Sequence, residues 1–128
     1  MTSLRLSALL SCLIGYILAM SFNNKEIVLI TGANVGLGLE VARLLLRDHG
    51  ERFYCLIGCR TLSKGEAAVK ELYDQGLAGC EVIEITVTDS DSIRQAADMV
   101  EERFGRVDVL HVNVRLNLAD KAEHEADA

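Results

Sequence analysis

The sequence predicts an α/β fold in which a doubly wound parallel sheet carries helices on both faces. Three observations predict it. Short apolar runs alternate with stretches of helical periodicity, the runs are apolar throughout, and the first of them ends in a turn rich in glycine. Strands that alternate with helices pair in parallel through right-handed crossovers, and such strands are buried on both faces.

The first strand and helix enclose the glycine-rich turn. Glu26–Thr31 is a continuous apolar strand, and helical spacing of apolar residues begins at Gly36 and stops at Gly50, a residue typical of helix ends. Between them, glycines at positions 32, 36 and 38 let the backbone approach a ligand closely. The N–H groups at the start of the helix face that turn, so this segment predicts a binding site for a nucleotide pyrophosphate.

A second strand and helix follow after a short connection. Phe53–Gly58 is apolar throughout and predicts a buried strand. Ser63 and Glu66 have the spacing of a capping box, which predicts a helix that begins near Ser63 and runs toward Gly76.

The third unit predicts one more strand, one helix and a final strand. The third strand is predicted at Glu81–Val87, and Asp89 or Ser90 caps a helix that ends near Phe104. Val107–Val112 is the fourth strand. The expected strand order is 3-2-1-4, a partial Rossmann-like sheet that binds its ligand beside the switch point at the carboxyl ends of the strands.

The N-terminus carries an apolar run that leaves three interpretations open. Leu6–Phe22 contains no charged residue, and its length lies between the apolar core of a signal peptide and a spanning helix of roughly 20 residues. It is a membrane anchor, a cleaved signal, or a buried helix or wrongly joined exon. The predicted organisation is a signal or anchor at residues 1–22, a partial dinucleotide-binding domain at 23–114 and a polar tail at 115–128, in a membrane-associated protein whose domain faces the cytosol. A cytoplasmic or secretory location is the alternative.

Composition excludes some partners. The net charge is −6, so the sequence offers no basic patch for a nucleic acid.

Cys55 and Cys59 share one predicted strand and stand about 13 Å apart at the strand rise, which is beyond disulfide reach. The cysteines are expected to be free thiols, and no Cys and His cluster has the spacing of a metal site.

Four segments together resemble the short-chain dehydrogenase/reductase family, and most closely its carbonyl-reductase-like members. Thr31–Gly38, read TGANVGLG, fits the TGxxxGxG pattern of the family, Cys59-Arg60 ends the second strand, Lys64–Leu72 reads KGEAAVKEL, and Val107–Leu110 reads VDVL. The resemblance covers about residues 25–114, the N-terminal, cofactor-binding half. It implies a nicotinamide dinucleotide as cofactor and an oxidoreductase as the parent activity.

The residue pattern favours NADP over NAD. Family members that prefer NAD carry an acid at the end of the second strand, which accepts from the ribose 2′-OH, whereas this chain has Cys59 followed by Arg60. A guanidinium there favours a 2′-phosphate. Carbonyl-reductase-like proteins often have a second basic residue in the glycine turn, where this chain has Val35.

The resemblance implies a set of cofactor contacts along the carboxyl edge of the sheet. Two positions depart from the family pattern: Thr86 stands where an acid usually reaches the adenine, and a single Asn remains of the NNAG motif after the fourth strand. A threonine hydroxyl still makes one hydrogen bond, so adenine binding is expected to weaken. The implied contacts are Gly32, Asn34, Val35, Gly36, Leu37, Gly38, Arg60, Thr86, Val87 and Asn113.

The residues that reduce a carbonyl in the family have no counterpart in this sequence. Relatives use a Ser, a Tyr that donates a proton and a Lys that lowers the pKa of that Tyr, all beyond the fourth strand. None of Tyr16, Tyr54 and Tyr73 has a Lys four residues on. The sequence therefore predicts no catalytic residue and a truncated, inactive cofactor-binding portion. The alternative is a non-catalytic, membrane-tethered nucleotide-binding or interaction module, and an uncovered fourth strand predicts self-association.

Overall fold

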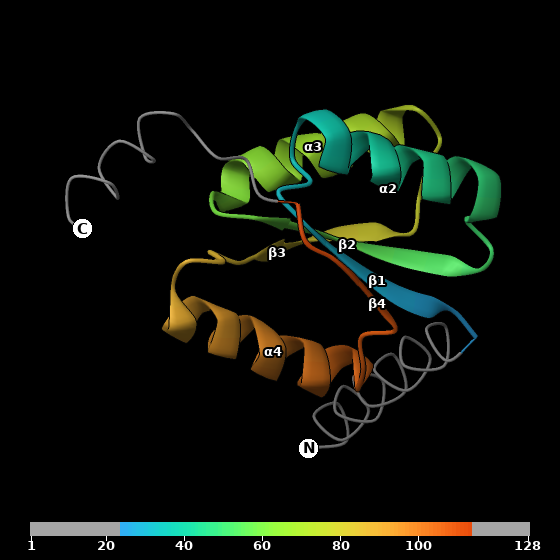
Figure 1. Ribbon diagram of the computed structural model, residues 1–128. Helices are drawn as coiled ribbons and strands as arrows, with labels where there is room; N and C mark the ends of the chain where they lie inside the picture. Colours follow the sequence, from blue (N-terminus) through green and yellow to red (C-terminus); the bar gives the residue numbers. More distant parts are fainter. Residues whose placement is uncertain (1–23, 114–128) are drawn as a thin grey trace, which may run out of the picture.

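A computed structural model describes residues 24–113 as one parallel sheet between two layers of helices (Figure 1). The predicted strand order 3-2-1-4 is confirmed, with neighbours β3-β2-β1-β4 all paired in parallel. Helices α2 and α3 cover one face and α4 covers the other, as Figure 1 shows. The elements are β1 (Glu26–Thr31), α2 (Gly36–His49), β2 (Phe53–Cys59), α3 (Leu62–Asp74), β3 (Cys80–Glu84), α4 (Ser90–Phe104) and β4 (Val109–His111).

The predicted apolar helix at residues 6–22 and the polar tail at 115–128 lie outside the described residues. Between residues 24 and 113, no helix has the length and apolar character needed to cross a bilayer.

Two predicted strand boundaries and one predicted helix cap were wrong. The third strand ends at Glu84 and not at Val87, because the Thr86 N–H leaves the sheet to donate to the Ser92 hydroxyl at 2.8 Å. The fourth strand is confined to Val109–His111. The predicted helix start near Ser63 is confirmed, since α3 begins at Leu62, but the capping box is wrong because the cap is Thr61, which makes no side-chain capping bond.

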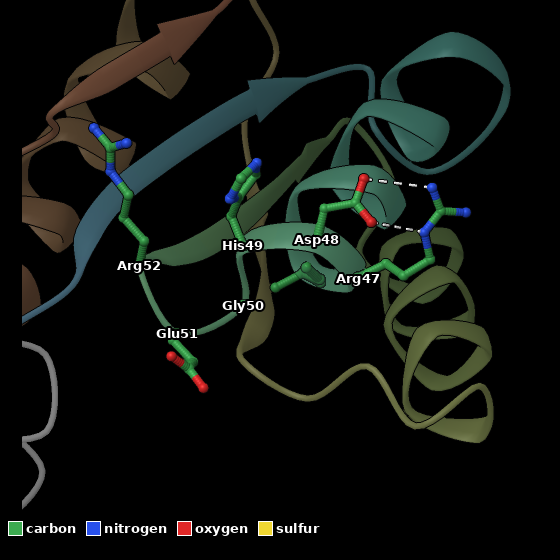
Figure 2. Close-up of a pocket in the computed structure, with 7 residues that line it drawn as sticks. Arg47, Asp48, His49, Gly50, Glu51 and Arg52 are labelled. Atoms are coloured by element: carbon green, nitrogen blue, oxygen red, sulfur yellow. Dashed lines mark hydrogen bonds and ion pairs between the residues drawn. The ribbon is translucent and has the colours of Figure 1, made fainter.

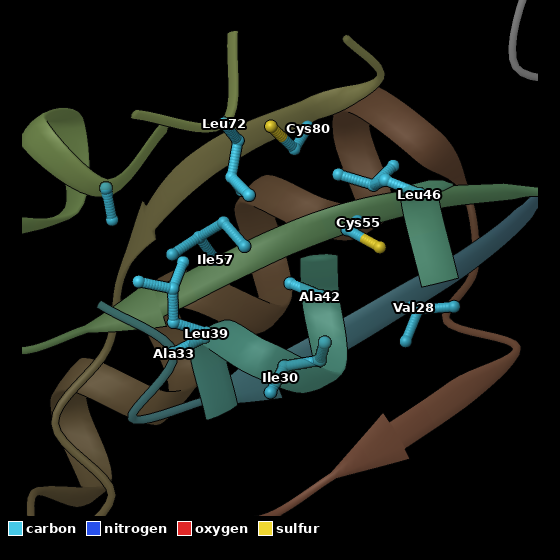
Figure 3. Close-up of a cluster of buried hydrophobic side chains, with 11 residues drawn as sticks. Val28, Ile30, Ala33, Leu39, Ala42, Leu46, Cys55, Ile57, Leu72 and Cys80 are labelled. Carbon is cyan, nitrogen blue, oxygen red and sulfur yellow. The ribbon is translucent and has the colours of Figure 1, made fainter. Parts of the chain in front are cut away.

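The core forms two apolar clusters, one on each face of the sheet. Alternate β1 residues separate into them: Val28 and Ile30 face α2 and α3 (Figure 3), whereas Ile27 and Leu29 face α4. Burial on both sides explains why this strand is apolar throughout. Each such buried side chain contributes about 1.5–3 kcal/mol relative to exposure, so β1 anchors the sheet to the helices on both of its faces.

The three cysteines between residues 24 and 113 are free and buried, in agreement with the sequence prediction. Cys55 on β2 and Cys80 on β3 are direct register partners. Burial raises the pKa of Cys55 to about 12 and that of Cys80 to about 11, so both thiols stay protonated near neutral pH. These sulfurs therefore act as small apolar groups of the core.

Strand β4 is the least covered element of the sheet. It pairs with β1 over three residues, and all three are exposed. Leu110 is 59% exposed, and Val109 and Val112 are exposed as well. An edge with apolar side chains is a known site of strand pairing between chains. Self-association through this edge remains a prediction.

Asp108 attaches the start of β4 to the start of β1. Its carboxylate accepts a hydrogen bond from the Ile27 N–H at 2.7 Å, and its own N–H donates to the Ile27 carbonyl at 2.9 Å. Arg106 donates to the same carboxylate and, at 2.9 Å, to the Lys25 carbonyl. The hydrogen bond from Ile27 and the neighbouring guanidinium hold the pKa of Asp108 below its ordinary value.

We expect Asp108→Asn to lower the free energy of unfolding at pH 7, because the amide cannot replace the charge that Ile27 and Arg106 stabilise. A depressed carboxyl pKa contributes stability above the unfolded-state pKa of about 3.9, and this contribution is lost as the pH falls through the folded-state pKa. The difference from the wild type should therefore shrink between pH 7 and pH 3 in urea denaturation. Asp98→Asn, at an exposed acid of α4, is the matched control. An equal difference at both pH values would contradict this role.

Candidate functional site

The structure brings every predicted contact residue to one edge of the sheet. The glycine turn follows β1, Arg60 follows β2, Thr86 and Val87 lie in the loop after β3, and Asn113 follows β4. Because the strands are parallel, their carboxyl ends meet at this edge. Strand β1 lies between β2 and β4, so the strand order reverses direction at β1, and such a switch point is where open α/β sheets bind ligands.

All three glycines of the turn have a conformation or a contact that disfavours a side chain. Gly32 has φ +64°, and a Cβ there would lie 2.6 Å from the Asn113 carbonyl oxygen. A Cβ at Gly38 would lie 2.7 Å from the Gly32 carbonyl oxygen. Gly36 also has a positive φ, of +66°, but the space around it is open. Glycine is therefore required at 32 and 38 for packing, and at 36 for backbone conformation alone.

Asn113 holds the turn from the side of β4. Its N–H donates to the Thr31 hydroxyl oxygen at 3.0 Å, and the Asn113 carbonyl oxygen lies 3.5 Å from the same hydroxyl. On the other side, the Ala33 N–H donates to the Gly58 carbonyl at 3.1 Å. The turn is thus fixed by the ends of both neighbouring strands. The sequence motif included Thr31 and the contact set included Asn113, but the bond between the two was not predicted.

The start of α2 is left open to an anion. Its cap residue, Val35, makes no side-chain capping bond, and the first turn contains no acid. By contrast, α4 is capped as predicted, because the Asp89 carboxylate accepts from the N–H groups of Asp91 and Ser92. Leu37 in the first turn of α2 is 69% exposed. Backbone donors with the positive end of a helix dipole fit a phosphate, so these residues match the pyrophosphate of a dinucleotide.

The end of β2 presents one cation. Arg60 is exposed, and within residues 24–113 its side chain makes no hydrogen bond or ion pair. The preceding Cys59 is 4% exposed, and its thiol donates to the Thr61 carbonyl at 3.2 Å. Burial is the main cause that raises the pKa of this thiol. Cys59 therefore offers no charge to a ribose at this edge, whereas Arg60, the next residue, offers a cation.

The loop after β3 forms the next part of the edge. Thr86 and Val87 are half-buried, and the bond from the Thr86 N–H to Ser92 ties this loop to α4. Sequence reasoning missed Ser92, since a serine in the first turn of a helix gives no signal of a loop contact. Asn34, within the glycine turn, is also half-buried.

The described tyrosines lie away from this edge. Tyr54 is near the start of β2, where its hydroxyl donates to Glu81 at 3.0 Å, and Tyr73 is near the end of α3. A surface hollow lined by residues 46–52 lies at the same far end, beside the start of β2 (Figure 2). Arg47 is paired with Asp48 there. This hollow is separate from the glycine turn and contributes nothing to it.

We expect Gly32→Ala to destabilise the protein by about 1–3 kcal/mol more than Gly36→Ala, because the first change adds a steric clash to the strain of a positive φ. Gly76→Ala is the matched control, since Gly76 has φ +79° and open space but lies far from the turn. Thermal and urea unfolding would measure the three variants. Equal losses at 32, 36 and 76 would show that the Asn113 contact does not restrict the turn.

Known proteins match this chain over the same region. The short chain dehydrogenase family model matches residues 26–128. The short-chain dehydrogenase/reductase ATR10 of Stachybotrys chlorohalonatus is 54% identical over 89 residues, which are 70% of this chain and 32% of that protein. Carbonyl reductase [NADPH] 1 of Sus scrofa is 32% identical over 94 residues, which are 73% of this chain and 32% of that protein.

A solved structure agrees in fold. A metagenomic short-chain oxidoreductase in complex with NADP superposes with a TM-score of 0.57 and 28% identity, over 66% of this chain and 37% of that one. The chain spans about a third of the length of the curated relatives described above. It belongs to the short-chain dehydrogenase family and corresponds to the N-terminal portion of relatives that include a carbonyl reductase.

Proposed function

We propose that this chain is the NADP-binding portion of a carbonyl-reductase-like oxidoreductase. The observation that carries the proposal is the glycine turn, fixed by Asn113 beside an uncapped helix start, on the same sheet edge as an exposed Arg60. The turn would hold the pyrophosphate, and Arg60 would pair with the 2′-phosphate of the adenosine ribose.

The start of α3 adds to the preference for a phosphate. It contains no acid in its first turn, and the exposed residues Thr61, Ser63 and Lys64 supply two hydroxyls and a second cation. Glu84, the register partner of Cys59, is an exposed acid at the same edge and opposes the preference. The two cations lie together at the end of β2 and the start of α3, and this pair supports NADP over NAD. The metagenomic relative described above was solved with NADP.

The nicotinamide group would supply the hydride, and the residues of this chain would bind and orient the cofactor. Thr86 and Val87 would line the adenine side, and Asn113 would hold the turn beside the nicotinamide ribose. The sequence contains no Tyr with a Lys four residues on, so we further propose that this chain binds the cofactor without reducing a carbonyl by itself.

Arg60→Ala should weaken NADPH binding about tenfold, the loss of one charge-assisted contact, and should change NADH binding by less than about twofold. Isothermal titration of the 128-residue chain with each dinucleotide measures both values. Arg94→Ala, at an exposed arginine of α4, is the matched control. Because Arg60 is exposed, the NADPH preference should also decrease as salt concentration rises. Equal weakening of NADPH and NADH would argue against a 2′-phosphate contact.

Purified 128-residue chain should give no NADPH consumption above the blank with quinones or aldehydes, since no residue is placed to donate the proton. Gly36→Asp, which puts a carboxylate at the phosphate turn, serves as the control that cannot bind the cofactor. If the wild type consumes NADPH and Gly36→Asp abolishes this activity, the prediction of inactivity is wrong. The proposal that the chain binds NADP would then still stand.

A further inference from the structure

The thiol of Cys59 lies against the short segment between β2 and α3, which contains Arg60. Its Sγ donates to the Thr61 carbonyl oxygen at 3.2 Å, across the single residue Arg60. The same carbonyl accepts the N–H groups of Lys64 and Gly65 at 3.1 and 3.2 Å, which begin α3. Thr61 has no side-chain capping bond of its own. The thiol is therefore the side-chain donor that fixes the carbonyl from which α3 starts.

The first turn of α3 is packed directly onto this sulfur. A Cβ at Gly65 would lie 2.4 Å from the Cys59 Sγ and 2.2 Å from the Val82 Cγ2, so glycine alone fits there. The Gly65 backbone amide lies against the thiol and lowers its pKa, although burial raises it more. Glu84 is the charged group that acts on this thiol, and it also raises the pKa. The sulfur stays protonated near neutral pH and keeps its hydrogen-bond donor.

The backbone of Cys59 is fixed as firmly as its side chain. Cys59 is the last paired residue of β2, and its carbonyl accepts from the Ile85 N–H at 2.9 Å. Arg60 is thus held between two anchored neighbours, one by the sheet and one by the thiol. Only its side chain is left to order when an anion binds, and a smaller ordering cost means a tighter contact.

We propose that Cys59 is a positioning residue for Arg60, and that its bond to the Thr61 carbonyl determines how strongly the site prefers a 2′-phosphate. This inference rests on the proposed NADP-binding function and adds to it a residue that does not touch the cofactor. A carboxylate at position 59 would accept from a ribose hydroxyl. The thiol at this position faces inward and acts through the backbone of its neighbours.

The test compares Cys59→Ala with Cys59→Ser in the 128-residue chain. Serine keeps a donor for the Thr61 carbonyl, whereas alanine removes it. Isothermal titration with NADPH and NADH gives the ratio of the two dissociation constants. Alanine should lower the NADPH preference about fivefold, as expected for the loss of one hydrogen bond, and serine should retain it within about twofold. Cys80→Ala is the matched control, since it removes a buried thiol at the opposite end of the sheet.

A second measurement is independent of the cofactor. Amide hydrogen exchange at Gly65 in the free chain should be faster in the alanine variant than in the serine variant, because the start of α3 loses its anchor. If the wild type binds neither dinucleotide, the proposed function fails, and with it the specificity role of Cys59. If the wild type prefers NADPH but alanine weakens both dinucleotides alike, or leaves the ratio unchanged, Cys59 is merely structural and this inference is overturned.

Discussion

The candidate site depends on one contact, the pair of backbone groups of Asn113 against the hydroxyl of Thr31. This contact joins the last residue of β1 to the segment after β4, and it does so beneath the glycine turn. The carbonyl of Asn113 occupies the space that a side chain at Gly32 would need. The conformation of the turn is therefore determined by its contact with the segment after β4. The glycines of the turn contribute the backbone flexibility that this conformation requires.

The opposite end of the β1–β4 pairing is fixed by an ionic contact. Asp108 accepts from the Ile27 N–H and pairs with Arg106, whereas the site end uses a neutral hydroxyl and backbone groups. Between the two lie only three paired residues of exposed β4. The contacts that fix the turn are therefore neutral, and the ionic contact lies at the far edge.

The order and pairing of the strands could be predicted from the sequence because each strand is buried on both faces, as β1 shows. The site edge could be predicted because the carboxyl ends of parallel strands meet there. The end of β3 could not be predicted, since it depends on the Ser92 hydroxyl, which competes with the sheet for the Thr86 N–H. The start of α3 near Ser63 could be predicted, but its capping could not, because the Thr61 carbonyl accepts from the Cys59 thiol and from the first N–H groups of the helix. Such single side-chain contacts leave no periodic signal in the sequence.

The two hydrogen bonds at the ends of the β1–β4 pairing also determine when the site can form during folding. Ile27 and Asp108 are 81 residues apart, and Thr31 and Asn113 are 82 apart. Closing a loop of this length costs chain entropy before any contact repays it, so this pairing belongs to the late, non-local part of folding. During synthesis, β1, β2 and β3 with their helices emerge before Asn113 does. The glycine turn is synthesised early, but it can reach its final conformation only after Asn113, the last described residue, has been made.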